Sequence, residues 1–148
     1  MTMSFWSVRP PRRSAGTMTL RAVTAVAVLV SGISHGYLYF FDGWGDIHVI
    51  GPLFLVNAVS GIVICVLVLA WKHWVPLFLA FGFSLMTASA FLISRWWGLF
   101  GIQDTVFGFW QILCLIAEAV GLVAALAAFL SERWLSLLGG RSANAVVA

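Results

Sequence analysis

The stretch that decides the fold of this chain is Ser31–Gly61, SGISHGYLYFFDGWGDIHVIGPLFLVNAVSG. Two apolar runs flank a short glycine-rich segment, which predicts two helices joined by a tight turn. A histidine and an amide, His35 and Asn57, stand within the apolar runs. The turn adds three further polar side chains: Asp42, Asp46 and His48. Polar groups are rare elsewhere in the chain, so this stretch is the first place to look for chemistry.

The composition around this stretch is that of an integral membrane protein. Of the 148 residues, 62% are apolar and only 9% are charged, whereas a soluble domain averages about 45–50% apolar and roughly 25% charged. The mean hydropathy of +1.04 agrees. The net charge of +3 comes without a basic stripe, so no nucleic-acid partner is expected. Cys65 and Cys114 both fall in apolar runs and are interpreted as small buried hydrophobes.

Working outward, the hydrophobic pattern predicts four membrane-spanning helices. They cover residues 20–41, 47–70, 74–94 and 106–130. Each has about 20 residues or more, enough to cross a ~30 Å hydrocarbon layer, and in lipid such spans must be helical to satisfy their backbones. Short connections make sequential helices antiparallel neighbours. We therefore predict an all-α membrane protein, an antiparallel four-helix transmembrane bundle over residues 19–138, with a short continuation along the inner surface after the fourth span.

The two ends of the chain differ from the bundle in composition. Residues 1–18 hold three arginines around a proline pair and predict a flexible basic arm, and residues 139–148 predict a disordered tail. With the N-terminus inside, only Arg95 among the basic residues lies outside. An excess of Lys and Arg marks the cytoplasmic side. We therefore expect a multi-pass protein of the plasma (inner) membrane with both termini cytoplasmic.

Glu118 is the costliest residue in the predicted bundle, because it lies near the middle of the fourth span. A charged side chain at the bilayer centre costs at least ~2.5–3.5 kcal/mol. The carboxyl could be neutral, could face a watery cavity, or could pair with a polar group on a neighbouring helix. Glu118 is thus either a hydrogen-bonded lock between helices or a ligand-binding or proton-handling group.

Three other polar residues can join Glu118 in a seam through the bundle. Gln111 shares a face of the fourth helix with Glu118, since seven residues make about two turns. His35 lies roughly 9 Å inside the outer end of the first span, and its expected partner at that depth is Gln111. Asn57 on the second span could reach either His35 or Glu118. These four residues are the candidates for ligand or proton handling.

Five residues are expected at the outer mouth of this seam: Asp42, Asp46, His48, Arg95 and Asp104. Histidine and aspartate can bind a divalent cation, and His35 with His48 could bracket a haem iron. Neither arrangement has a specific spacing, so no cofactor is predicted, and haem or a divalent cation stays open as an alternative. The two aspartates of the turn could instead cap helix ends. The apolar connection over residues 95–104 could fold back over the outer end of the bundle.

The order of these residues resembles a known family. The pattern S-x3-H-x6-D-x3-D-I-x2-I-G-P-L-F-L-x-N-A-V-x-G over residues 31–61 looks like the signature of small four-span integral membrane proteins of actinobacteria. The resemblance covers the first two spans and, more loosely, the acid of the fourth. It implies a fold and a membrane location but no activity. The four-helix plan is only superficially similar to DoxX-like proteins, because the glycine-rich opening of that family is missing here.

Two classes of function follow from these observations. An accessory or structural protein, for example a subunit of a larger membrane complex, agrees with the small hydrophilic parts and the lack of a catalytic motif. Its partners would be the lipid bilayer and other membrane subunits. The alternative is a small carrier or ligand-binding protein that uses the seam for a proton, a cation, a quinone or haem. An enzyme is less expected, because no nucleophile–base pair can be named.

Overall fold

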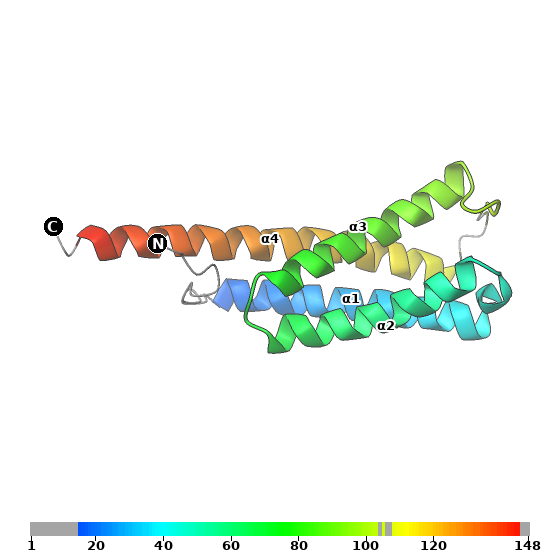
Figure 1. Ribbon diagram of the computed structural model, residues 1–148, viewed down its shortest axis with the longest axis horizontal. Helices are drawn as coiled ribbons and strands as arrows, with labels where there is room; N and C mark the ends of the chain where they lie inside the picture. Colours follow the sequence, from blue (N-terminus) through cyan, green and yellow to red (C-terminus); the bar gives the residue numbers. More distant parts are fainter. Residues whose placement is uncertain (1–14, 104, 106–107, 146–148) are drawn as a thin grey trace, which may run out of the picture.

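The computed structural model describes residues 15–103, 105 and 108–145, and over these residues the chain forms a bundle of four α-helices without a strand. The helices are α1 (Ala15–Phe41), α2 (Ile50–Ala70), α3 (Val75–Trp96) and α4 (Phe109–Ala145), and a 3-10 turn, η1 (Trp44–Asp46), joins α1 to α2. Figure 1 shows α1, α2 and α4 running side by side, with α3 crossing them at an angle. The predicted all-α, antiparallel four-helix bundle is confirmed.

The helix bounds depart from the predicted spans at three places. η1 occupies the end of the first connection, so α2 begins at Ile50 rather than at residue 47. Residues 15–18, predicted as part of the basic arm, belong to α1, and residues 1–14 lie outside the described part. α4 runs on to Ala145 where a disordered tail was predicted from residue 139. No proline interrupts this region, and a helix that has already formed adds residues at its end more easily than a new helix starts, even across Gly139 and Gly140.

The outer surface of the bundle is apolar on every helix. Val26 on α1, Val56 on α2, Phe78 on α3 and Val123 on α4 each expose about 60% of their surface or more. All four helices are long and apolar enough to cross a membrane. An apolar exterior of this kind suits lipid rather than water. The protein is therefore an integral membrane protein that crosses the membrane several times.

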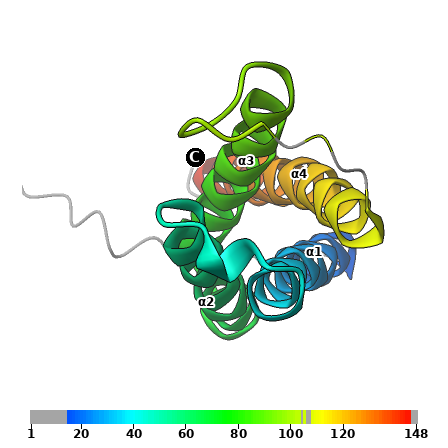
Figure 2. The same ribbon diagram turned by 90° about the vertical axis from the view of Figure 1, so that its right-hand side faces the viewer.

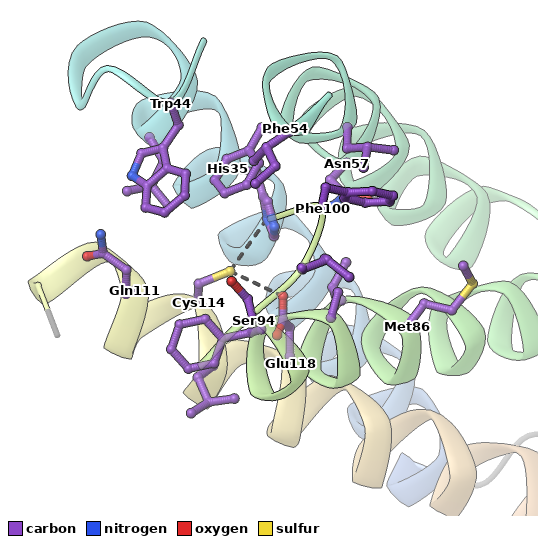
Figure 3. Close-up of a pocket in the computed structure, with 18 residues that line it drawn as sticks. His35, Trp44, Phe54, Asn57, Met86, Ser94, Phe100, Gln111, Cys114 and Glu118 are labelled. Carbon is purple, nitrogen blue, oxygen red and sulfur yellow. Dashed lines mark hydrogen bonds between the residues drawn. The ribbon is translucent and has the colours of Figure 1, made fainter. Parts of the chain in front are cut away.

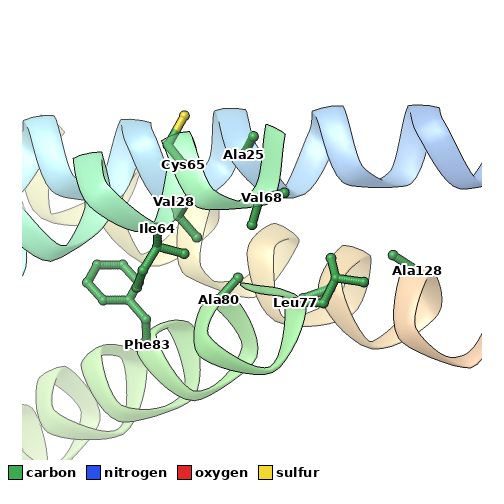
Figure 4. Close-up of a cluster of buried hydrophobic side chains, with 10 residues drawn as sticks. Ala25, Val28, Ile64, Cys65, Val68, Leu77, Ala80, Phe83 and Ala128 are labelled. Carbon is green, nitrogen blue, oxygen red and sulfur yellow. The ribbon is translucent and has the colours of Figure 1, made fainter. Parts of the chain in front are cut away.

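One half of the bundle, which we call the Arg21 end, is tightly packed. It contains the start of α1, the α2–α3 turn and the second half of α4 (Figure 1). Its core, drawn in Figure 4, consists of Ala25, Val28, Ile64, Cys65, Val68, Leu77, Ala80, Phe83, Ala125 and Ala128. Small residues dominate this cluster, and in lipid they let helix backbones approach closely enough for van der Waals packing to hold them. Cys65 lies in this core as the sequence indicates.

Two glycines bring α1 and α2 into direct backbone contact. A Cβ atom on Gly61 would lie 2.6 Å from the carbonyl oxygen of Val28 and 2.8 Å from Cα of Gly32. Gly36, four residues along α1, would make only an ordinary contact with Ala58. The α1–α2 interface therefore depends on the Gly32–Gly61 pair.

The Arg21 end is closed by a buried arginine on α1. The Arg21 guanidinium donates two hydrogen bonds to the Glu132 carboxylate of α4, at 2.6 and 3.0 Å. It also donates to the carbonyl oxygens of Val68 and Trp71 at the end of α2, at 3.1 and 3.3 Å. A further bond of 2.6 Å reaches the His73 carbonyl. The last carbonyls of a helix lack partners of their own and carry partial negative charge. Arg21 therefore satisfies them while tying α1, α2 and α4 together.

Substitution of Gly61 by alanine tests the backbone contact. Gly61→Ala is expected to lower the thermal unfolding midpoint of the purified protein in detergent, because the added methyl group meets backbone atoms and overpacking costs about 1–3 kcal/mol. Gly82→Ala on α3 is the matched control, because nothing lies within 4 Å of a Cβ there. Equal midpoints for the two variants would contradict the proposed α1–α2 interface.

The arginine cluster makes a second prediction. Arg21→Met should destabilise the protein by about 3–5 kcal/mol, because it removes the cation from a buried carboxylate and leaves the end of α2 uncapped. Lys72→Met is the control, since Lys72 lies exposed in the neighbouring α2–α3 turn. Chemical unfolding followed by tryptophan fluorescence measures both. If the two variants lose the same small amount of stability, Arg21 does not hold the helices together.

Candidate functional site

The other half of the bundle is hollow. A cavity of about 330 Å³ lies among all four helices, with α1 and α4 at its floor and α2 and α3 at its walls. α3 diverges from α2 toward this end of the bundle, as Figures 1 and 2 show from two directions. The walls are mainly apolar, and they include Leu38, Ile50, Leu53, Phe54, Met86, Ala90, Phe91 and Leu115. A concave, apolar pocket that ends on a few polar groups is the usual form of a small-molecule site.

Four polar side chains form what we call the polar floor: His35 from α1 and Cys114 and Glu118 from α4 line the cavity, and Ser31 of α1 contacts all three without lining it. The spacing within each pair is four residues, which places both members on one face of their helix. The Cys114 thiol lies 3.2 Å from Oε1 of Glu118 and 3.5 Å from Nδ1 of His35. Figure 3 shows His35, Cys114 and Glu118 converging from the two helices.

Glu118 is held by neutral donors. Its side chain is only 2% exposed, and Oε1 accepts hydrogen bonds from the Ser31 hydroxyl at 3.2 Å and from the Cys114 thiol at 3.2 Å. Thr87 of α3 also lines the cavity beside it. Glu118 therefore has a polar partner on a neighbouring helix, the Ser31 hydroxyl, and it also lines a cavity.

His35 pairs with a different residue from the one predicted. Nδ1 of His35 lies 2.9 Å from the Ser31 carbonyl oxygen and 3.5 Å from the Cys114 sulfur. Gln111, its expected partner, instead donates its amide N–H to the carboxylate of Asp42 at 3.4 Å. The prediction erred because depth was counted from approximate span ends; Gln111 and Cys114 share a face of α4, and the actual offset of α4 along α1 places Cys114, about one turn further along, at His35. Cys114 is likewise not the simple apolar residue that its surroundings in the sequence indicated.

All four residues of the predicted seam nevertheless line the one cavity: His35, Asn57, Gln111 and Glu118. Asn57 stands on the α2 wall, half-buried, and its side chain makes no hydrogen bond to another residue of the described ranges. Its amide and that of Gln111 therefore offer polar groups above the floor. The four residues form a lining rather than one continuous hydrogen-bonded chain.

The cavity opens sideways between α2 and α3. Its most exposed lining residues are Leu53 on α2, Met86 on α3 and Phe100 in the connection after α3, at 43%, 74% and 61% of their surface. In a bilayer this opening would face lipid, because both helices carry apolar side chains outward. A ligand that enters here would therefore come from the membrane.

A strained turn places Phe100 at this opening. The backbones of Leu99 and Ile102 exchange two hydrogen bonds of 2.8 and 3.0 Å. Between them, Phe100 and Gly101 have φ values of 52° and 80°, as in a type I′ turn. Positive φ is uncommon for an aromatic residue, and such strain tends to occur at functional sites. The apolar connection thus folds back toward the bundle through this tight turn.

Aromatic rings line the cavity next to His35. The indole of Trp44 stacks on Phe54, with ring centroids 5.3 Å apart and planes 6° apart. Phe54 in turn meets the His35 ring edge-on, with centroids 5.1 Å apart. A row of three rings, Trp44, Phe54 and His35, therefore lines the cavity (Figure 3).

The predicted mouth residues take other positions. Asp42, Asp46 and His48 are exposed, and none of them lines the cavity. The carbonyl oxygen of Arg95 accepts a hydrogen bond from the side chain of Gln103, and Asp104 lies outside the described residues. His48 therefore does not share a site with His35. Asp42 contacts a cavity residue, because its carboxylate accepts a hydrogen bond from Gln111.

Sequence reasoning missed Cys114, Trp44 and Phe100 as parts of the site. Cys114 had a usable signal, because it stands four residues before Glu118 and so on the same helix face. Trp44 lies in η1, and its stacking on Phe54 depends on the bend there, which the sequence does not indicate. Nothing in the sequence indicated that Phe100 would adopt a positive φ.

The two acids of α4 make a matched pair for testing the site. Glu118→Gln should leave stability almost unchanged, because a glutamine oxygen still accepts hydrogen bonds from the Ser31 hydroxyl and the Cys114 thiol. Glu132→Gln should destabilise the protein by several times as much, because it removes the charge opposite the buried Arg21. Thermal unfolding in detergent measures both. A strong loss in Glu118→Gln would show that this carboxyl mainly locks the helices.

Comparison of the chain with protein-family models, curated proteins and solved structures found no match. The resemblance of residues 31–61 to four-span membrane proteins of actinobacteria therefore stays a prediction that rests on those residues. What the protein does must be argued from three features of its own structure: the cavity, the polar floor and the opening between α2 and α3.

Proposed function

We propose that this protein binds a small lipophilic compound that enters its cavity from the membrane. The observation that carries the proposal is the position of the cavity, which opens between α2 and α3 and ends on Glu118. A carboxyl at such depth costs free energy that a bundle packed only for stability avoids by using an apolar residue. Its retention beside a cavity is explained if Glu118 binds a ligand.

The lining favours a planar ring that carries hydrogen-bonding groups. Trp44, Phe54 and Phe100 offer aromatic surface for stacking. The imidazole, thiol and carboxyl of the polar floor, with the amides of Asn57 and Gln111, can hydrogen-bond a polar head group. Pockets for small molecules range over about 300–1,000 Å³, so a cavity of about 330 Å³ suits one ring system. A quinone head group with its tail between α2 and α3 fits this description.

The location we propose is the plasma (inner) membrane, with both termini in the cytoplasm. Among the described residues, Arg21, Lys72 and Arg133 gather at the Arg21 end, and Arg95 stands at the opposite end of α3. The three arginines near the N-terminus of the sequence add to the same side. The positive-inside rule supports this orientation. The cavity would then lie in the outer half of the membrane.

A subunit of a larger membrane complex is the second candidate. The observation that favours it is a shallow apolar groove on the outside of α1 and α4, lined by Ala22, Val23, Val26, Ala27, Val30, Leu113, Ile116, Ala117 and Val120. Small side chains of this kind allow a neighbouring helix to approach closely. A monomeric protein without a co-purifying partner in mild detergent would count against this role and would leave ligand binding untouched.

Filling the cavity tests the proposed binding. A soluble short-chain quinone should raise the thermal unfolding midpoint of the wild type, because a ligand that binds only the folded state adds about 2.7 kcal/mol at 100 times its Kd. Ala90→Phe should abolish the shift, since Ala90 lines the cavity. Ala119→Phe, on an exposed position of α4, is the control and should keep the shift. An equal shift in both variants would place the quinone elsewhere, and no shift in the wild type would contradict the proposal for quinones.

A further inference from the structure

The polar floor has the composition of a transition-metal site. His35, Cys114 and Glu118 are all buried, and their candidate ligand atoms lie within 4.8 Å of one another. Imidazole and thiolate bind zinc and similar borderline metals, whereas magnesium and calcium prefer oxygen ligands alone. Three protein ligands with one open position is the usual arrangement of a catalytic or ligand-binding zinc site.

The spacing of the atoms agrees with tetrahedral coordination. The Cys114 sulfur lies 3.5 Å from Nδ1 of His35 and 3.2 Å from Oε1 of Glu118. The Ser31 hydroxyl oxygen, which does not line the cavity, lies 3.5 Å from Nδ1, 3.6 Å from the sulfur and 3.2 Å from Oε1. With zinc bond lengths of about 2.0–2.3 Å, an ion bound to the sulfur and to each of its two neighbours would have bond angles of roughly 95–107°, close to the tetrahedral value.

Charge balance points in the same direction. The sulfur and the carboxylate oxygen are too close for both to be anionic in an apolar interior without a cation between them. A divalent cation between them satisfies this constraint, because it forms bonds to both the sulfur and the oxygen, and any protons that these two groups carry leave to solvent as it binds.

We propose that His35, Cys114 and Glu118 bind one divalent transition-metal ion of the zinc class at the floor of the cavity. The inference rests on the proposed function in that both use this cavity, and all three ligands line it. Binding through Nδ1 of His35 replaces its hydrogen bond to the Ser31 carbonyl. A molecule in the cavity can then take the fourth position, so the metal would hold the polar head of the lipophilic ligand.

Cobalt(II) tests the site because a cobalt–thiolate bond gives a charge-transfer absorption band. The full-length protein in detergent, first treated with a chelator, should bind one Co²⁺ per chain with this band, and Zn²⁺ should displace it. Cys114→Ala should lose the band and weaken metal binding at least about 100-fold, since even the outer partners of metal ligands are worth about 10–100-fold. Cys65→Ala is the matched control, a second buried cysteine that lies in the packed core, and it should behave as the wild type.

Glu118→Gln supplies a second variant that should stay folded. It should keep the cobalt–thiolate band but weaken Co²⁺ binding at least about 10-fold, because the amide oxygen carries no charge. The inference is overturned if the wild type shows no band, or if Cys114→Ala binds Co²⁺ as tightly as Cys65→Ala does. Quinone binding measured on the chelator-treated protein separates the two proposals. A thermal shift with the quinone but no metal binding would support the proposed function and overturn the metal site. Metal binding without a thermal shift would overturn only the proposal for quinones.

Discussion

The burial of Glu118 is the constraint on which the functional half of this molecule depends. Its carboxyl lies in the middle of an apolar helix and accepts hydrogen bonds from neutral donors, the Ser31 hydroxyl and the Cys114 thiol. These two groups come from different helices, so α1 and α4 must face each other at a defined rotation. The same rotation brings His35 to the sulfur and leaves the side of Glu118 toward α2 and α3 open to the cavity.

The bundle can keep such a cavity because contacts outside the cavity hold its other half together. Small residues help to pack the helices of the Arg21 end, and the Gly32–Gly61 contact holds α1 against α2 near the middle of the bundle. Arg21 then ties α1 to α4 and to the end of α2. With this end held, α3 can diverge from α2 at the other without loss of the fold, and the divergence makes the sideways opening. The residues that stabilise the bundle and the residues at the cavity opening thus lie in different halves of it.

The sequence predicted the fold well because hydrophobic length and polar scarcity decide it. Four apolar runs could only be helices in lipid, and Glu118 stood out because it is costly there. The partners were harder to predict, because each depends on how far the helices are shifted along one another and on how each is rotated. His35 meets Cys114 rather than Gln111, and Arg21 reaches Glu132, 111 residues away in the chain. The positive φ of Phe100 comes from the pairing of Leu99 with Ile102, which no local pattern indicates.

The central claim is that the cavity beside Glu118 holds a lipophilic molecule in the membrane. Native mass spectrometry of the protein released from the membranes in which it was made tests this most directly. The wild type should carry one small lipophilic adduct per chain, and Ala90→Phe, whose larger side chain fills the cavity, should carry none. The bare polypeptide mass for the wild type, or the same adduct on both proteins, would contradict the account.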